Sequence, residues 1–137
     1  MKIKQDRMKN VFVVIVMAIL LISCNFSQIR IGEVRMMYGS NEDRHISYNY
    51  STFTGVENGS SEVNAGQIIS FEFTVTVDKG SIMIEWQDPD GEVVWRKNLE
   101  KSDRGEDAIL AESSGNYGVV IQGKNASGDF ELLWEIE

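Results

Sequence analysis

Strict alternation of apolar and polar residues is the feature that most constrains the fold of this chain. The clearest example is the stretch from residue 69 to residue 77, in which every second side chain is apolar: Ile69, Phe71, Phe73, Val75 and Val77. A period of two residues is that of a β-strand, and a helix would need a period near 3.6. The stretch therefore predicts a strand with one buried face and one wet face.

The same period recurs along most of the chain. It is present in residues 46–50, 82–86, 93–95, 117–121 and 130–136. The sequence Asp88-Pro89-Asp90-Gly91 is typical of a turn, because proline fixes φ and glycine accepts a positive φ. It predicts a β-hairpin between about 80–87 and 92–98. A second turn-rich stretch, 123–128, predicts another hairpin near the C-terminus.

Two segments have no clean period. Residues 99–116 are charged and rich in Gly and Ser, which predicts a loop containing one short strand. The segment 29–39 is expected to be a strand, because no helix-capping pattern precedes it. We therefore predict an all-β fold, an antiparallel jelly-roll-like β-sandwich of seven or eight short strands, over residues 29–137. At 137 residues and 42% hydrophobic content, the chain is expected to form one such domain.

Residues 63–137 contain turn and aromatic motifs that resemble those of a known group of domains. A strand follows Gly66-Gln67, a "DPDG" turn starts at Asp88, and "SGNY" (114–117) leads into the last strands. This order resembles the small jelly-roll sandwiches of the GOLD and bacterial pre-peptidase C-terminal type. The resemblance implies a non-catalytic module that works in protein or carbohydrate contacts. No functional residue carries over from it.

The N-terminus has the pattern of an export signal. Lys2, Lys4, Arg7 and Lys9 precede an apolar run of 12 residues, 11–22. At about 1.5 Å per residue this run reaches only about 18 Å, short of the roughly 30 Å hydrocarbon core of a bilayer. A basic start, a short apolar run and a small residue at its end are typical of a secretory signal peptide.

The end of that run is more specific. Leu21-Ile22-Ser23-Cys24 resembles the lipobox of bacterial lipoproteins, which implies cleavage after Ser23 and lipidation of Cys24, the single cysteine. We predict a signal peptide over 1–23, a lipidated tether over 24–28 and the sandwich over 29–137. The protein would be anchored in the cell membrane on its extracytoplasmic face. Asn25 after the cysteine indicates the outer membrane in a Gram-negative host; the alternative reading is a short signal anchor.

Removal of residues 1–23 changes the charge balance. That segment holds four of the 13 basic and one of the 21 acidic residues, which leaves 9 basic and 20 acidic side chains and a net charge of −11. A surface of this charge repels phosphate backbones, so no nucleic-acid partner is expected.

The sequence offers little for catalysis, and no catalytic residue is assigned. The single histidine, His45, lies in a charged segment, and no G-x-S-x-G motif occurs. Glu85, Asp88, Asp90 and Glu92 cluster around the first hairpin, where a solvated turn is the favoured interpretation over a glycosidase pair. No cofactor is expected.

A calcium site is a weak alternative at the same turn. Asp88 and Asp90 are its candidates, with Asp103, Glu106 and Asp107 as further oxygen ligands, but the spacing lacks most of an EF-hand loop. The favoured interpretation is a plain turn without a metal.

The aromatic residues leave the function open. Trp86, Trp95 and Trp134 share the register of apolar neighbours, which predicts core positions, whereas Tyr38, Tyr48 and Phe53 are candidates for an exposed patch. The leading hypothesis is a binding or accessory domain with a protein partner, which an apolar surface patch would favour. The alternative is a carbohydrate- or cell-wall-binding module, which predicts at least two exposed aromatic side chains on one face. A small hydrolase is a third hypothesis.

Overall fold

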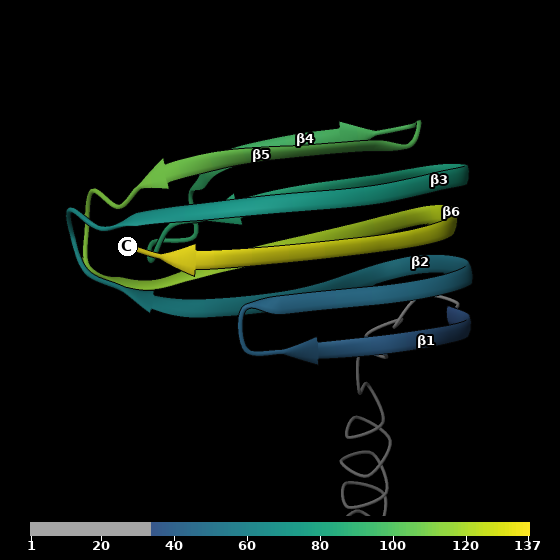
Figure 1. The fold of residues 1–137 in the computed structure, drawn as a ribbon, viewed down its shortest axis with the longest axis horizontal. Coiled ribbons are helices and arrows are strands. Elements are labelled where there is room, and N and C mark those ends of the chain that lie inside the picture. The colour runs from purple at the N-terminus through teal and green to yellow at the C-terminus, as the bar shows by residue number, and fades with distance from the viewer. Residues whose placement is uncertain (1–33) are drawn as a thin grey trace, which may run out of the picture. The chain divides into compact units, whose positions relative to one another are not determined.

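The computed structural model describes residues 34–137, and in it every strand pairing is antiparallel (Figure 1). The six strands are β1 (Val34–Glu42), β2 (His45–Val63), β3 (Ile68–Gln87), β4 (Val93–Leu99), β5 (Asp103–Leu110) and β6 (Gly115–Ile136). No helix occurs among these residues, and therefore none that could cross a membrane. The prediction of an all-β antiparallel fold is confirmed. In place of the seven or eight short strands expected, residues 34–137 form six, because β2, β3 and β6 continue for 19, 20 and 22 residues.

Three long strands build both sheets of the sandwich. The first part of β3 pairs with β5 and with the second part of β6, whereas its last part pairs with β4 and the first part of β6. Likewise β2 pairs first with residues 126–133 of β6 and then with residues 115–123. The chain thus forms a five-stranded sheet (β1, β2, β6, β3, β5) and a four-stranded sheet (β2, β6, β3, β4). In Figure 1, β2, β3 and β6 bend at the end opposite the C-terminus.

The first predicted hairpin is confirmed. Strands β3 and β4 pair from Ile82↔Leu99 to Gln87↔Val93 around the turn at Asp88. The Gly91 amide donates to the Asp88 carbonyl oxygen over 3.0 Å, and Gly91 has a φ of 83°. The strand expected within 99–116 is β5.

The second predicted hairpin is wrong. Residues 115–136 form one continuous strand, and its two halves lie in different sheets and do not pair with each other. The turn-forming residues at 123–128 bend the strand instead of reversing it. Asn125 has a φ of 48° and Gly128 of 140°, and a Cβ at Gly128 would lie 2.0 Å from the Thr76 carbonyl oxygen.

One hydrophobic core lies between the sheets. Its largest side chains come from both, and they include Trp86, Tyr50, Tyr117, Phe53 and Phe130. Trp86 and Trp134 meet edge to face with ring centroids 5.6 Å apart. The core positions predicted for these two tryptophans are confirmed, and Trp95 is half-buried at the margin of the core.

Two of the sequence motifs contact each other. A Cβ added at Gly115, in "SGNY", would lie 2.8 Å from ring carbons of Pro89, in the "DPDG" turn, and Gly115 has a φ of 147°. The start of β6 therefore requires glycine at this position. Ser23, Cys24, the tether over 24–28 and the first residues of the 29–39 segment lie outside the described residues.

Candidate functional site

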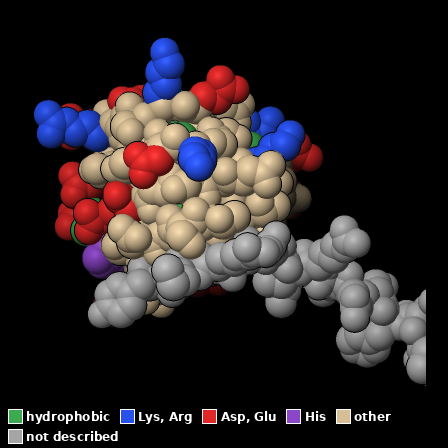
Figure 2. Space-filling view, turned by 90° about the vertical axis from the view of Figure 1, so that its right-hand side faces the viewer, with side chains coloured by type: hydrophobic (Ala, Val, Ile, Leu, Met, Phe, Trp, Pro, Cys, Tyr) green, Lys and Arg blue, Asp and Glu red, His purple; other side chains and the backbone are tan. Residues whose placement is uncertain are grey.

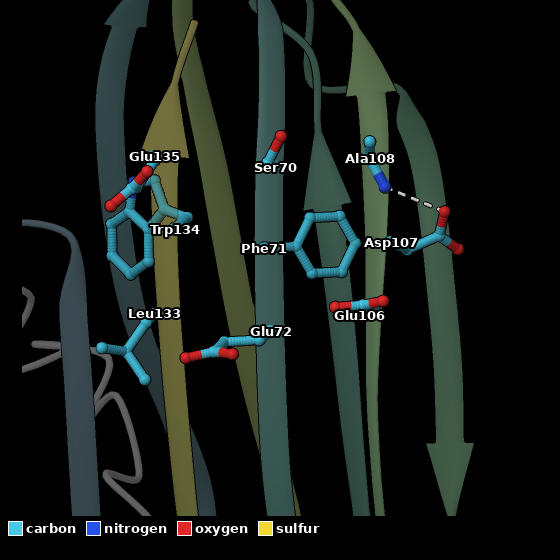
Figure 3. A pocket seen from close by; sticks show the side chains of 9 residues that line it. All are labelled: Ser70, Phe71, Glu72, Glu106, Asp107, Ala108, Leu133, Trp134 and Glu135. Atoms are coloured by element: carbon cyan, nitrogen blue, oxygen red, sulfur yellow. Dashed lines mark hydrogen bonds between the residues drawn. The ribbon is translucent and has the colours of Figure 1, made fainter.

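The outer face of the five-stranded sheet is hollowed in two adjoining places. The first, depression A, has a volume of about 660 Å³ and is lined by residues of β3, β5 and β6. Its lining is Ser70, Phe71, Glu72, Glu106, Asp107, Ala108, Leu133, Trp134 and Glu135. Figure 3 shows that three of its acidic side chains, Glu72, Glu106 and Glu135, come from three adjacent strands.

The alternation that builds the core also places these glutamates outside. Phe71 and Phe73 point inward, so Glu72 between them points outward. Glu72 lies directly opposite Glu106 on β5 and opposite Leu133 on β6. Like charges directly opposite on neighbouring strands are destabilising. None of Glu72, Glu106 and Glu135 has a hydrogen-bond or ion-pair partner among residues 34–137, so depression A offers unpaired acceptors.

The second hollow, depression B, has a volume of about 570 Å³ and a more mixed lining. It is formed by Gly39, Ser40, His45, Ser47, Tyr48, Asn49, Thr74, Asp129, Phe130 and Glu131. The sequence alone suggested no role for His45. The structure places it at the start of β2, with Nε2 3.0 Å from Glu131 Oε1. Figure 2 shows acidic side chains gathered beside the histidine.

The carboxylates singled out in the sequence do not form one site. Glu85 lies on the outer face of the four-stranded sheet, where its side chain is 7% exposed and accepts from Gln87 and Arg96 over 2.7 Å each. Asp88 Oδ1 accepts from the backbone amides of Asp90 and Glu92, which closes the turn. Calcium binding at Asp88 and Asp90 stays the weaker alternative to a plain turn. Within residues 34–137 no three acidic, histidine or cysteine residues group around a metal position.

The acids of β5 also have different surroundings. Asp103 forms an ion pair with Lys97 over 2.8 Å, and Asp107 accepts from Trp95 Nε1 over 2.8 Å. The hydrogen bond from Lys97 lowers the pKa of Asp103, and the backbone amide of Ala108 lowers the pKa of Asp107. The hydrogen bond from Gln87, followed by that from Arg96, lowers the pKa of Glu85.

No aromatic side chain is exposed among residues 39–137, so the prediction that a carbohydrate-binding module would carry at least two exposed aromatic side chains on one face is not met there. Of the three patch candidates, Phe53 is 1% exposed, so its surface assignment is wrong; Tyr48 is half-buried and the Tyr38 side chain lies outside the described part. Phe53 is buried because the bend of β2 turns it toward the core, 5.4 Å from the Tyr50 ring. The exposed large apolar side chains are scattered over the strands: Val56, Ile68, Val93, Val94 and Leu110.

Comparison with known proteins gives a likeness of fold alone. No protein-family model and no curated protein matches the sequence. Among solved structures, TmCBM61 in complex with β-1,4-galactotriose is 15% identical, with a TM-score of 0.44 over 74% of this chain and 69% of that one. A CBM4 structure is 9% identical, with a TM-score of 0.48 over 80% of each chain. PirA is 15% identical, with a TM-score of 0.46 over 70% of this chain and 97% of that one. Likenesses at this level assign no ligand and no site.

Proposed function

We propose that this protein is a non-catalytic, lipid-anchored binding domain that holds a carbohydrate on the outer face of its five-stranded sheet. The observation that carries the proposal is the pair of adjoining depressions, lined by carboxylates, hydroxyls and an amide. The carboxylates of Glu72, Glu106 and Glu135 have no hydrogen-bond or ion-pair partner within the described part of the chain. Volumes of about 660 and 570 Å³ lie in the range of small-molecule sites.

The chemistry of this face selects the ligand class. On the face of a sheet the backbone groups are already paired in the ladders, so only side chains are free to bind. Carboxylates accept hydrogen bonds and do not donate them. A ligand that satisfies Glu72, Glu106 and Glu135 together must therefore present several donors, and a sugar does so with its hydroxyl groups. Hydrogen bonds to charged acceptors are among the stronger ones.

A large protein interface fits this face less well. The buried centre of a protein–protein interface is depleted in charged residues, whereas Glu72 and Leu133 stand side by side at the centre here. The second candidate is a cationic protein segment, which the charge of the face favours. The two candidates differ in salt dependence, because screening weakens attraction between exposed opposite charges.

A hydrolytic role has less support. A glycosidase uses one carboxyl group with a raised pKa as its general acid. The displaced carboxyl pKa values among the described residues, those of Glu85, Asp103 and Asp107, are all lowered. Only Asp107 of these three lines a depression. Binding without turnover is therefore the function we propose.

The proposal of a lipid anchor is based on the sequence of the N-terminal segment. Cleavage after Ser23 and acylation of Cys24 would hold the domain on the extracytoplasmic face of a membrane through the tether 24–28. Cells grown with labelled palmitate should label the wild type and not Cys24→Ala, and only the wild type should fractionate with membranes. An unlabelled wild-type protein would contradict the anchor and leave the binding proposal standing.

The binding proposal is tested on the full-length protein purified in detergent. We expect a panel of neutral oligosaccharides, built from β-1,4-linked glucose, galactose or N-acetylglucosamine, to contain a ligand whose affinity changes little between low and high salt. Glu72→Gln should weaken it by about tenfold, the loss of roughly 1.4 kcal/mol. Glu62→Gln, an exposed glutamate on β2 in the four-stranded sheet, is the matched control. Binding of none of the panel, or an equal effect of both variants, would contradict the proposal.

A further inference from the structure

We infer that the ligand is an extended chain of several sugar units that lies across the strands, from β5 to β1, and fills both depressions at once. This inference rests on the proposed function. It adds the length of the carbohydrate to that function, because a site for a single sugar ring would need only one of the two hollows.

One row of the sheet joins the two depressions. The register aligns Glu106, Glu72, Leu133, His45 and Glu42 across β5, β3, β6, β2 and β1. The first three of these line depression A, and the fourth, His45, lines depression B. The hollows therefore meet at this row, which runs perpendicular to the strands, and the rest of depression B lies on the rows beyond it.

The adjacent row continues the same surface. It aligns Arg104, Thr74, Glu131, Ser47 and Ser40 across the same five strands. Thr74, Glu131, Ser47 and Ser40 line depression B. Since Glu72 and Thr74 are outward-facing neighbours on β3, depression A passes into depression B without an intervening strand.

The length of this surface exceeds one sugar ring. Adjacent strands lie about 4.8 Å apart, so the four steps from β5 to β1 span about 19 Å.

The two ends of the surface differ in the hydrogen bonds that they can form. Depression A offers glutamate acceptors, whereas Ser47, Asn49 and Thr74 in depression B both donate and accept hydrogen bonds. A chain with hydroxyl groups along its length matches both ends.

The His45–Glu131 pair lies where the hollows meet. Its 3.0 Å contact joins β2 to β6 on the outer face, and the side chains are 34% and 48% exposed. A ligand that crosses from one hollow to the other must therefore pass over this pair. The surface lies on the face and not at an edge, so an added β-strand would have no free backbone groups to bind there.

The test measures how affinity depends on chain length. Calorimetry on the full-length protein in detergent uses the one- to six-unit members of whichever β-1,4-linked series binds in the panel. We expect affinity to rise by about tenfold or more from the monosaccharide to the tetrasaccharide and then to level off. Equal affinity for one unit and four units would overturn the inference while leaving the proposed function intact, whereas no binding at any length would overturn the proposed function.

Two variants test where the two ends of the bound sugar chain lie. Glu72→Gln alters depression A and Asn49→Ala alters depression B. Both should weaken the tetrasaccharide several-fold, and at most one of them should weaken the monosaccharide. Asn58→Ala, an exposed residue of β2 in the four-stranded sheet, is the control for Asn49→Ala. If Asn49→Ala leaves tetrasaccharide binding unchanged, the ligand does not reach depression B and the inference fails.

Discussion

The indole of Trp95 on β4 donates to Asp107 Oδ2 on β5 over 2.8 Å, and this bond joins the edges of the two sheets. The edges have no backbone pairing with each other. Beneath the bond, the Trp95 ring meets Phe71 edge to face with centroids 4.9 Å apart. Beside it, Lys97 pairs with Asp103 and lies 5.0 Å from the Phe73 ring centroid. Side chains alone thus close this flank of the core.

Asp107→Ala should lower the free energy of unfolding by about 0.5–1 kcal/mol, since a neutral donor on an exposed acceptor contributes little. Asp107→Asn keeps an acceptor and should restore most of the loss. Urea unfolding followed by tryptophan fluorescence measures both. If the Asn variant is as unstable as the Ala variant, the hydrogen bond is not the cause.

Arg96→Met should lower the free energy of unfolding at pH 7 by about 1–3 kcal/mol, because it leaves the buried Glu85 carboxylate without its cation. The folded-state pKa of Glu85 lies below its ordinary value of 4.5, so the pair stabilises the fold fully above pH 4.5. That contribution is lost as the pH falls through the lowered pKa. Urea titrations from pH 7 to pH 3 should therefore show the gap between wild type and variant closing in acid. A gap that stays constant would contradict this account.

Gly123→Ala should be strongly destabilising, whereas Gly118→Ala should be nearly neutral. A Cβ at Gly123 would lie 2.1 Å from the buried Phe53 ring, but at Gly118 the nearest atom is 3.9 Å away. Overpacking of this kind costs about 1–3 kcal/mol or more, while alanine on an open strand restricts the unfolded chain slightly. Thermal unfolding of the two variants gives the comparison directly. Similar melting temperatures would mean that Phe53 has room to move.

Tyr50→Phe should leave stability unchanged or raise it, whereas Tyr117→Phe should lower it by about 0.5–1.5 kcal/mol. Both side chains are 2% exposed. Within residues 34–137 the Tyr50 hydroxyl has no hydrogen-bond partner, and its burial raises its pKa. The Tyr117 hydroxyl donates to the Ser113 carbonyl oxygen over 3.1 Å. Equal losses in guanidinium unfolding would indicate that a bound water satisfies Tyr50.

The strands could be predicted from the sequence because alternation is a local property. Ile69, Phe71 and Phe73 face the core as their spacing requires, and Pro89 and Gly91 form the expected turn. The bends could not be predicted in the same way. A turn-rich stretch such as 123–128 suits a hairpin or a corner equally well, and the outcome depends on whether β2 and β3 flank both halves of β6. That is a property of the whole sheet.

Most of the candidate site could not be predicted from the sequence for the same reason. Glu72, Glu106 and Glu135 are far apart in sequence, and only the register of three strands brings them together. Their outward positions follow from the alternation, so an acidic outer face could be predicted from the sequence. The depressions in that face could not be predicted, because they depend on which small residues, such as Ser70 and Ala108, become neighbours across strands.

The position of β6 also sets the order in which the chain can fold. Strands β2 and β3 have no pairing with each other, and both rest on β6 in each sheet. During synthesis from the N-terminus, β6 is thus made after β2 and β3, the two strands that it pairs with. The earlier hairpins can form, but neither sheet is complete until the 22 residues of β6 are available. The two sheets therefore stay unclosed until β6 has been synthesised.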